Sequence, residues 1–234
     1  MTGASSGIGR ATAILLTKKG AKVALTARSK NKLEDLSRDL PGSLVVAADI
    51  SREKEAGQMV SLVARYFGRV DILVNNAGQG YDSPVEKTDL KKLQAIFDLN
   101  LLGPLVAMQK VIPLMRKQGG GVIVNISSGT SLMYLPNMGA YSGLKCTLNA
   151  ISLTAREELK EDKISVSVVY PYITATDFEE NTLKEDFEAE WEDNGREIPP
   201  SDSAKYAAQK ILEAIVTEKA EIFAHEWMKN RKGT

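Results

Sequence analysis

The chain has one cysteine and one histidine among its 234 residues. A single thiol, Cys146, cannot form a disulfide within the chain, so there is no framework of the kind that small secreted domains use. The helical pattern around Cys146 favours a small packed residue over a reactive thiol. His225 has no clustered partners and lies away from the motifs described below, so the sequence predicts no metal site.

An excess of charge of either sign is also missing. Lys plus Arg and Asp plus Glu both number 30, which leaves a formal net charge of zero. This balance gives no indication of nucleic acid or an anionic membrane as the main partner. No apolar run approaches the roughly 18 residues of a membrane span, and no signal peptide opens the chain. These absences predict a cytoplasmic protein that binds neither nucleic acid nor membrane.

Short apolar runs alternate along the chain with longer amphipathic segments. The pattern predicts strands at 21–26, 44–48, 71–75, 121–126, 164–170 and 220–224, and helices at about 7–19, 29–39, 52–67, 89–117, 139–160 and 202–217. Several strands are apolar at both alternating positions, which is typical of strands covered on both faces. Strict alternation of strand and helix predicts an α/β fold with a doubly wound parallel sheet, in a single domain over 1–234.

Glycines at 3, 7 and 9 stand where the first predicted helix begins, in Thr2-Gly-Ala-Ser-Ser-Gly-Ile-Gly9. They let the backbone turn tightly and approach a pyrophosphate, while the helix N-terminus offers free N–H groups to it. A Gly-rich turn alone is a weak signal, but a helix and a strand follow this one. The turn therefore predicts a dinucleotide site with contacts from Gly3, Ser5, Ser6, Gly7, Ile8 and Gly9.

The strand that normally feeds such a turn is missing, since only Met1 precedes Thr2. In a doubly wound sheet this strand is central, and its loss leaves the neighbouring strands with unpaired backbone groups. Either residues stand upstream of Met1 or the chain is a truncated variant. The intact pattern downstream favours the first interpretation.

The strand at 21–26 is followed by Ala27-Arg28-Ser29-Lys30, with no acidic residue. An acid there usually binds the adenine ribose 2′-hydroxyl of NAD(H), whereas the 2′-phosphate of NADP(H) requires a cation. Arg28 can hold that phosphate with its bidentate guanidinium, and Lys30 stands close by. The alternative is a pair of surface cations at the start of a helix. The pattern favours NADP(H) over NAD(H) as the cofactor.

Tyr141 and Lys145 are four residues apart in a predicted helix, so their side chains share one face. A nearby ammonium lowers the pKa of a phenol from its ordinary value of about 10. Such a phenol can give a proton to a carbonyl oxygen as hydride arrives. Ser128 follows the strand at 121–126, at the sheet edge where ligands bind, and can contact the substrate oxygen. The alternatives are a chance helix spacing and a Ser-containing turn.

Taken together, these motifs resemble those of the short-chain dehydrogenase/reductase family, of the ordinary single-domain type. The family's order and spacing recur over essentially the whole chain in Thr2-Gly-x-x-x-Gly-x-Gly9, Asp49, Asn75-Asn-Ala-Gly78, Asn100, Ser128, Tyr141-x-x-x-Lys145 and Pro171. The resemblance implies a Rossmann-like fold and an oxidoreductase that interconverts a carbonyl and an alcohol.

The resemblance also implies a role for each of these residues. Tyr141 is the general acid/base and Ser128 orients the substrate oxygen. Lys145 lowers the pKa of Tyr141 and binds the nicotinamide ribose, and Asn100 holds a water that links Lys145 to solvent. The resemblance implies further contacts with the cofactor. Asp49 and Ile50 contact the adenine, and Asn76, Ala77 and Gly78 lie at the adenosine. Towards the nicotinamide the implied contacts are Pro171, Thr174 and Thr176, together with Tyr141 and Lys145.

Two further positions depart from the family pattern. Tyr172 replaces the usual glycine after Pro171, and it either adds bulk to the floor of the substrate site or is a packed aromatic. Leu144 stands before Lys145 in place of the usual serine, which changes packing and leaves the chemistry unchanged.

Residues 177–200 carry ten acidic residues against Lys184 and Arg196, with Phe178, Phe187 and Trp191 interleaved. The segment is too long for an ordinary connection and predicts a substrate lid; the alternative is a solvated acidic helix. Its charge disfavours polyanionic substrates of the acyl-CoA type. The predicted substrate is a small or medium hydrophobic ketone or aldehyde, in a pocket lined by Met133, Tyr134, Leu135, Met138 and Tyr172.

The predicted helices at 89–117 and 139–160 have broad apolar faces. Family members commonly pair these helices across a two-fold axis, so we expect a homodimer or homotetramer. Two alternatives to an enzyme remain: a cofactor-binding regulator without turnover, and an N-terminally truncated, inactive chain. The intact Asn100, Ser128, Tyr141 and Lys145 argue against the regulator.

Overall fold

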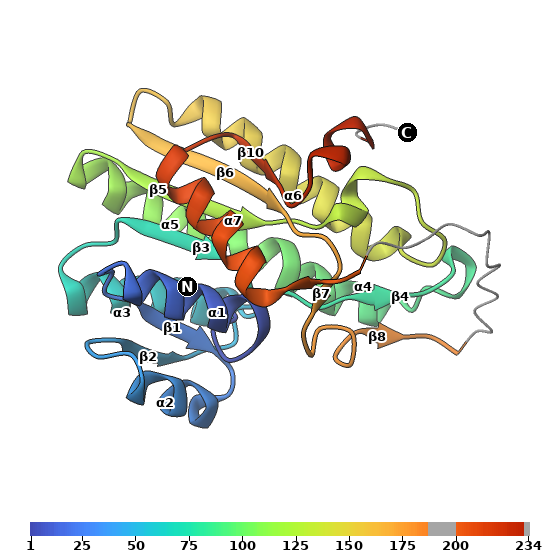
Figure 1. The fold of residues 1–234 in the computed structure, drawn as a ribbon, viewed down its shortest axis with the longest axis horizontal. Helices are drawn as coiled ribbons and strands as arrows, with labels where there is room; N and C mark the ends of the chain where they lie inside the picture. Colours follow the sequence, from blue (N-terminus) through green and yellow to red (C-terminus); the bar gives the residue numbers. More distant parts are fainter. Residues whose placement is uncertain (187–199, 232–234) are drawn as a thin grey trace.

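The computed structural model describes residues 1–186 and 200–231 of the chain. Parallel strands form its centre, with helices on both faces (Figure 1). The strands of this layer are β1 (Ala24–Ala27), β2 (Leu44–Ala47), β3 (Ile72–Asn75), β5 (Gly121–Ile126), β6 (Ile164–Tyr170) and β10 (Glu221–Phe223). The helices are α1 (Gly7–Lys18), α2 (Lys30–Arg38), α3 (Glu53–Phe67), α4 (Leu90–Phe97), α5 (Gly103–Gln118), α6 (Gly139–Glu158) and α7 (Ala204–Thr217). The α/β alternation read from the sequence is confirmed within a few residues.

The strands form two parallel groups, β10-β6-β5-β3 and β1-β2. Met1 and Thr2 lie between the groups, because the Thr2 N–H donates to Val74 O at 3.0 Å and the Thr26 N–H donates to Met1 O at 3.0 Å. In the described part of the chain, these two residues are all that occupies the position of the expected central strand. The resulting order is that of a doubly wound sheet, as predicted.

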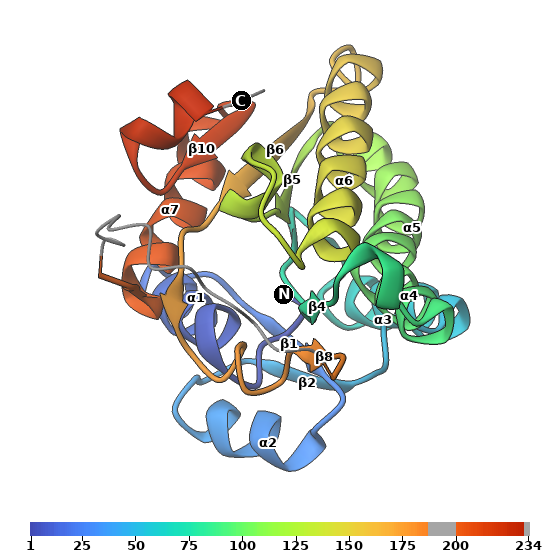
Figure 2. The ribbon, with the colours of Figure 1, turned by 90° about the vertical axis from the view of Figure 1, so that its right-hand side faces the viewer.

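Each face of the sheet has its own hydrophobic core. On one face lie α1, α2 and α7, and Leu16, Leu25 and Leu33 are buried together beneath them. On the other face α3, α5 and α6 enclose a larger core that includes Val60 and Ile123. Figure 2 shows α1 and α7 on the side of the sheet opposite to α5 and α6. The double cover explains why the strands are apolar at successive positions.

One continuous helical segment, Leu90–Gln118, joins α4, a π-helical turn at Asp98–Leu102 and α5. By length and composition it is long and apolar enough to cross a membrane, since an 18-residue window within it has a mean hydropathy of 1.4. The prediction that no stretch approaches that composition was therefore wrong for this segment. Met108, Val111 and Met115 are buried in the core against α3 and the sheet, which accounts for the apolar character without lipid.

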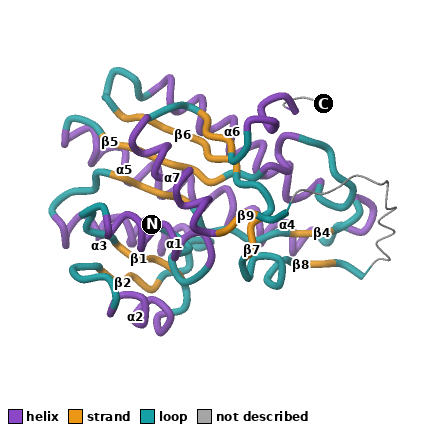
Figure 3. The backbone as a smooth tube through the Cα atoms, viewed as in Figure 1, coloured by secondary structure: helices purple, strands orange, loops and turns teal. Residues whose placement is uncertain are grey.

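Two short parallel pairs join segments that are distant in the sequence. β4 (Tyr81–Asp82) pairs with β8 (Leu183–Lys184), and β7 (Thr174–Ala175) pairs with β9 (Asp202–Ser203). Figure 3 shows both pairs beyond the carboxyl ends of the main strands. The β7–β9 pair joins the residues on either side of the predicted lid. The β4–β8 pair holds the first part of the lid at the same edge of the sheet. Residues 187–199 of the lid, with Phe187 and Trp191, lie outside the described residues.

Candidate active site

The Gly-rich turn leads directly into α1. Gly3 and Gly7 have positive φ angles of 66° and 51°, which favour glycine. A Cβ on Gly9 would overlap the Gly3 carbonyl oxygen, so Gly9 is required where the helix crosses the turn. Ser5, Ser6 and Ile8 are half-buried in the same turn. Since α1 has no side-chain cap and no acid in its first turn, its N–H groups are free for an anion such as a pyrophosphate.

Thr2 and Asn76 fasten this turn to the loop after β3. The Thr2 hydroxyl oxygen accepts hydrogen bonds from the backbone N–H groups of Asn76 at 3.0 Å and Ala77 at 3.1 Å. The Asn76 amide in turn donates to Thr2 O at 3.1 Å. The two segments that the sequence predicts around the cofactor therefore form one hydrogen-bonded unit.

Arg28 is exposed directly after β1, on the same side as Asp49. Burial alone would raise the pKa of Asp49, but hydrogen bonds from Ser51 and the charges of Arg28 and Arg52 outweigh it and hold that pKa below its ordinary value. The Ser51 hydroxyl donates to the Asp49 carboxylate at 2.7 Å. Ile50 beside it is buried. Arg28 thus keeps a guanidinium just after β1, close to an ionised carboxylate.

Tyr141 and Lys145 lie one turn apart on α6, both buried. The Lys145 Nζ lies 5.7 Å from the centroid of the Tyr141 ring and donates to Ile126 O at 2.9 Å. Tyr141 is hydrogen-bonded to Ser128, which follows β5. The sequence prediction that these three side chains meet is realised in the geometry.

Asn100 lies in the π-helical turn between α4 and α5 and is fully buried. Its amide donates to Gln79 O at 2.8 Å, and its Oδ1 accepts from the Gln79 N–H at 3.0 Å. A Cβ on Gly78 would lie 2.7 Å from Asn100 Oδ1 and 3.5 Å from Lys145 Nζ. The absent side chain of Gly78 therefore leaves room for these two polar groups to approach each other. π-Helical turns are frequent at functional sites, and this one carries a site candidate.

The pKa of Tyr141 beside Lys145 differs from the prediction. Burial raises the pKa of Tyr141 well above its ordinary value, and the hydrogen bond to Ser128 offsets only part of that rise. Burial also lowers the pKa of the Lys145 ammonium from 10.5 to about 8. We predicted that Lys145 lowers the pKa of Tyr141; in this structure desolvation outweighs that effect. The phenol is therefore protonated at neutral pH.

Thr130 fixes the orientation of the Ser128 hydroxyl. The Ser128 Oγ accepts hydrogen bonds from the Thr130 backbone N–H at 3.2 Å and from the Thr130 hydroxyl at 3.0 Å. A hydroxyl has one hydrogen to donate and two lone pairs. With both lone pairs engaged, the Ser128 hydrogen is available to Tyr141 or to a ligand. Sequence reasoning did not identify Thr130, because its role appears only in the turn geometry.

The segment after β6 closes the other side of the site. The Pro171 carbonyl accepts from the Gly129 N–H at 2.8 Å, which places it beside Ser128. Thr174 lies in β7. A Cβ on Gly7 would lie 3.1 Å from the Thr176 methyl carbon, so Thr176 covers the Gly-rich turn. Of these predicted contact residues, Thr176 lies against the Gly-rich turn and Pro171 lies beside Ser128.

Tyr172 and His225 belong to an aromatic cluster next to this segment. The Tyr172 ring meets those of His225 and Trp227 edge-on, at centroid distances of 5.6 and 5.5 Å. His225 Nε2 lies 3.0 Å from an oxygen of Asp202 in β9. The packed-aromatic alternative for Tyr172 fits this arrangement. The fold after β10 brings His225 against Tyr172, and no sequence signal indicates this contact.

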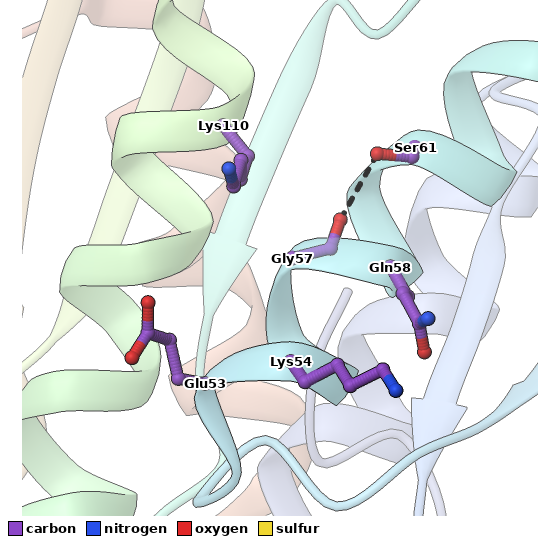
Figure 4. Close-up of a pocket in the computed structure, with 6 residues that line it drawn as sticks. All are labelled: Glu53, Lys54, Gly57, Gln58, Ser61 and Lys110. Carbon is purple, nitrogen blue, oxygen red and sulfur yellow. Dashed lines mark hydrogen bonds between the residues drawn. The ribbon is translucent and has the colours of Figure 1, made fainter.

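Two other predictions do not match the structure. Cys146 is exposed on α6, and its thiol contacts Ser131 O at 3.2 Å, so it is not a packed residue. Of the predicted pocket residues, Tyr134 is exposed, whereas Met133, Leu135 and Met138 are half-buried before α6. An open cleft elsewhere runs between α3 and α5 (Figure 4), and none of its lining residues is a predicted site residue: Glu53, Lys54, Gly57, Gln58, Ser61 and Lys110.

Comparison with known proteins identifies the family. A family model of short chain dehydrogenases matches residues 1–186. An uncharacterized oxidoreductase of Staphylococcus epidermidis is 30% identical over 217 residues, which cover 92% of this chain and 87% of the relative. A 3-oxoacyl-[acyl-carrier-protein] reductase of Synechocystis is 34% identical over 186 residues, covering 77% and 75%.

The same likeness extends to solved structures. A 3-ketoacyl-(acyl-carrier-protein) reductase of Brucella melitensis, crystallised with NADH, superimposes with a TM-score of 0.85 at 26% identity, over 95% of this chain and 93% of that one. The match of the family model over most of the chain, the relatives and the fold agree with the motifs. The chain belongs to the short-chain dehydrogenase/reductase family of oxidoreductases.

Proposed function

We propose that this chain is an NADP(H)-dependent oxidoreductase that interconverts a ketone or aldehyde and an alcohol, with Tyr141 as the general acid/base. The observation that carries the proposal is the convergence of Asn100, Ser128, Tyr141 and Lys145 at the carboxyl edge of the sheet. Ligands of doubly wound sheets bind at this edge. A cofactor-binding regulator would have no need of this buried set of proton donors.

The protonation states favour carbonyl reduction. Burial keeps the Tyr141 phenol protonated at neutral pH, which is the state of a general acid. The Ser128 hydroxyl can donate to the same substrate oxygen because Thr130 occupies its lone pairs. Lys145 is an ammonium below about pH 8 and can stabilise negative charge as the phenol gives up its proton. Asn100, against Gly78 and near Lys145, would hold a water that links Lys145 to solvent, and this water would pass the proton onward.

The Gly-rich turn suits a dinucleotide, since the N-terminus of α1 has no side-chain cap and offers its first N–H groups to a pyrophosphate. A nicotinamide bound there would exchange a hydride with the substrate carbon. The residues that would hold the dinucleotide are those of the turn, Gly3, Ser5, Ser6, Gly7, Ile8 and Gly9, with Arg28, Asp49, Ile50, Asn76, Ala77, Gly78, Pro171, Thr174 and Thr176. The preference for NADP(H) over NAD(H) rests on Arg28, whereas the Brucella relative was crystallised with NADH.

Arg28→Asp tests the cofactor preference. Loss of a charge-assisted hydrogen bond, with repulsion in its place, should weaken NADPH binding about ten- to a hundred-fold and leave NADH binding nearly unchanged. Nucleotide fluorescence titrations would measure both dissociation constants. Lys32→Asp, at an exposed position in α2, is the control. Equal effects of Arg28→Asp on the two cofactors would refute the assignment.

Tyr141→Phe tests the chemistry. General acid catalysis contributes about a hundred- to ten-thousand-fold, so turnover should fall by at least that much while NADPH still binds. Tyr66→Phe, on an exposed tyrosine of α3, should leave turnover unchanged. Near-normal activity of Tyr141→Phe would exclude the proposed role, and a wild-type chain that binds NADPH without any turnover would favour the regulator.

The substrate class follows from the charge of the segment over the site. Five acidic residues oppose Lys184 among its described residues: Asp177, Glu179, Glu180, Glu185 and Asp186. This field disfavours polyanionic ligands, although two relatives are named for 3-oxoacyl groups on a carrier protein. We infer a neutral hydrophobic carbonyl substrate. A carbonyl panel assayed with NADPH checks this, and turnover of charged substrates alone would contradict it.

We also infer a cytoplasmic homodimer or homotetramer. Exposed Leu102 at the start of α5 and exposed Cys146 and Thr147 on α6 leave a weakly polar surface on these neighbouring helices. Light scattering tests the inference, and a monodisperse monomer would contradict it.

A further inference from the structure

Phe178 lies against the Tyr141 ring. The two ring centroids are 5.9 Å apart and the ring planes are inclined by 55°. Phe178 is nevertheless 40% exposed, so the protein leaves part of its ring uncovered. An aromatic ring that touches the proposed acid and keeps a free surface is available to a ligand that approaches the same acid.

A tight turn holds Phe178 in this position. The Phe178 N–H donates to the Thr176 hydroxyl oxygen at 3.3 Å, and the Thr182 hydroxyl donates to Phe178 O at 3.0 Å. The turn rests on Gly80, where a Cβ would lie 3.2 Å from Phe178 Cε1. Phe178 is therefore fixed both by its own loop and by the segment that follows Gly78.

After this turn, three side chains link the segment to β4 and α4, which lie next to the site. The fully buried Tyr81 donates its hydroxyl hydrogen to Glu185 at 2.5 Å, and Lys92 pairs with the same carboxylate at 2.9 Å. Only 18% of the Glu185 side chain is exposed. We call Tyr81, Glu185 and Lys92 the rim anchor.

The backbone supports the rim anchor. The Leu183 N–H donates to Gly80 O at 3.0 Å and the Glu185 N–H donates to Asp82 O at 3.1 Å, as part of the β4–β8 pairing. The hydroxyl of the buried Tyr81 is costly to leave unpaired, and the partly exposed Lys92–Glu185 ion pair adds a smaller contribution, so together they favour one docked position. The segment from Phe178 to Glu185 is thereby fixed relative to α6.

We propose that Phe178 determines substrate specificity: its free ring surface packs against the group next to the carbonyl and favours aryl over small alkyl ketones. The rim anchor is a positioning element that keeps Phe178 against Tyr141. This inference rests on the proposed function and narrows its substrate class. Offset or tilted aromatic contact favours a flat substituent over a small aliphatic one.

The test compares kcat/KM for a phenyl methyl ketone and for a small dialkyl ketone, with NADPH. Phe178→Ala should lower the aryl-to-alkyl ratio about ten-fold, since it removes both stacking and buried apolar contact. Phe178→Leu should retain part of the preference. Tyr66→Ala, on an exposed aromatic far from the site, is the control. An unchanged ratio, or equal losses on both ketones, would overturn the proposal.

A double-mutant cycle tests the rim anchor. Tyr81→Phe removes the hydroxyl and should lower the aryl-to-alkyl ratio in the wild-type background. In the Phe178→Ala background it should have no further effect on the ratio, because the ring that it positions is gone. Additive effects on the ratio would show that the anchor does not act through Phe178.

A binding measurement separates this proposal from the proposed function. Calorimetry of the aryl ketone with the Tyr141→Phe protein and NADPH needs no turnover. Binding that weakens about ten-fold with Phe178→Ala supports the proposal even if no carbonyl is ever reduced. Binding that is independent of Phe178 overturns it even if the enzyme is active.

Discussion

Replacing Lys145 by methionine should stabilise the protein at neutral pH while it abolishes activity. The Lys145 side chain is only 4% exposed, and burial lowers the pKa of its ammonium from 10.5 to about 8. Its Nζ donates to one backbone carbonyl, Ile126 O. No ion pair involving Lys145 is found in the described residues. Folding therefore places a charge where it is poorly compensated.

The magnitude follows from the pKa. A fall from 10.5 to about 8 corresponds to about 3 kcal/mol of unfavourable free energy in the charged, folded state. Methionine fills a similar volume without charge, but it leaves the Ile126 carbonyl without this donor, at a cost of about 1 kcal/mol. The net gain is about 2 kcal/mol, or roughly 6 °C in Tm for a chain of this size.

The stability gain of Lys145→Met should depend on pH in one direction. The folded pKa lies below the unfolded one, so the cost of the Lys145 charge is complete below about pH 8 and disappears as the pH rises towards 10.5. Thermal unfolding of wild type, Lys145→Met and Lys32→Met at about pH 7 and pH 10 would measure it. The gain should shrink at the higher pH and be absent in the exposed Lys32 control. A less stable Lys145→Met at neutral pH, or an equal gain at both, would refute the reasoning.

Three further predictions concern the same site. The kcat/KM for reduction should stay level below about pH 8 and fall above it as Lys145 loses its proton; a level profile through pH 10 would contradict this. Gly9→Ala should abolish cofactor binding in titrations, because the added Cβ would overlap the Gly3 carbonyl oxygen in the turn. Gly143→Ala has open space around the added Cβ, so it should raise the free energy of unfolding by about 0.5–1 kcal/mol. Thr130→Val should lower kcat about five-fold through the Ser128 hydroxyl, and Thr130→Ser should restore it; no rescue would indicate a purely structural effect.

The main strands and helices could be predicted because local patterns determine them. Strands such as 121–126 and 164–170 are apolar runs, and glycines or a change of period mark where the helices begin and end. The Gly-rich turn could be predicted as well, since the positive φ angles of Gly3 and Gly7 and the approach of Gly9 to the Gly3 carbonyl are local requirements of the turn.

The rest depends on contacts between distant segments. The two-residue strands β4 and β8 are about a hundred residues apart and carry no periodic signal, so their pairing could not be predicted. The contact of His225 with Tyr172 is of the same kind. The pKa of Tyr141 was predicted in the wrong direction because a spacing reports a neighbour but not the depth of burial.

The π-helical turn at Asp98–Leu102 gives one helical segment two different directions of packing. Before it, Ile96 packs with α6 and the β4 region; after it, Met108 and Val111 pack with α3 and the sheet. One residue corresponds to about 100° of rotation around an α-helix. Deleting a single residue here would turn one half of the segment by that angle relative to the other. The register of the whole segment is thus set at the same turn that carries Asn100, so an insertion or deletion tolerated in a surface loop would here misdirect an entire helix face.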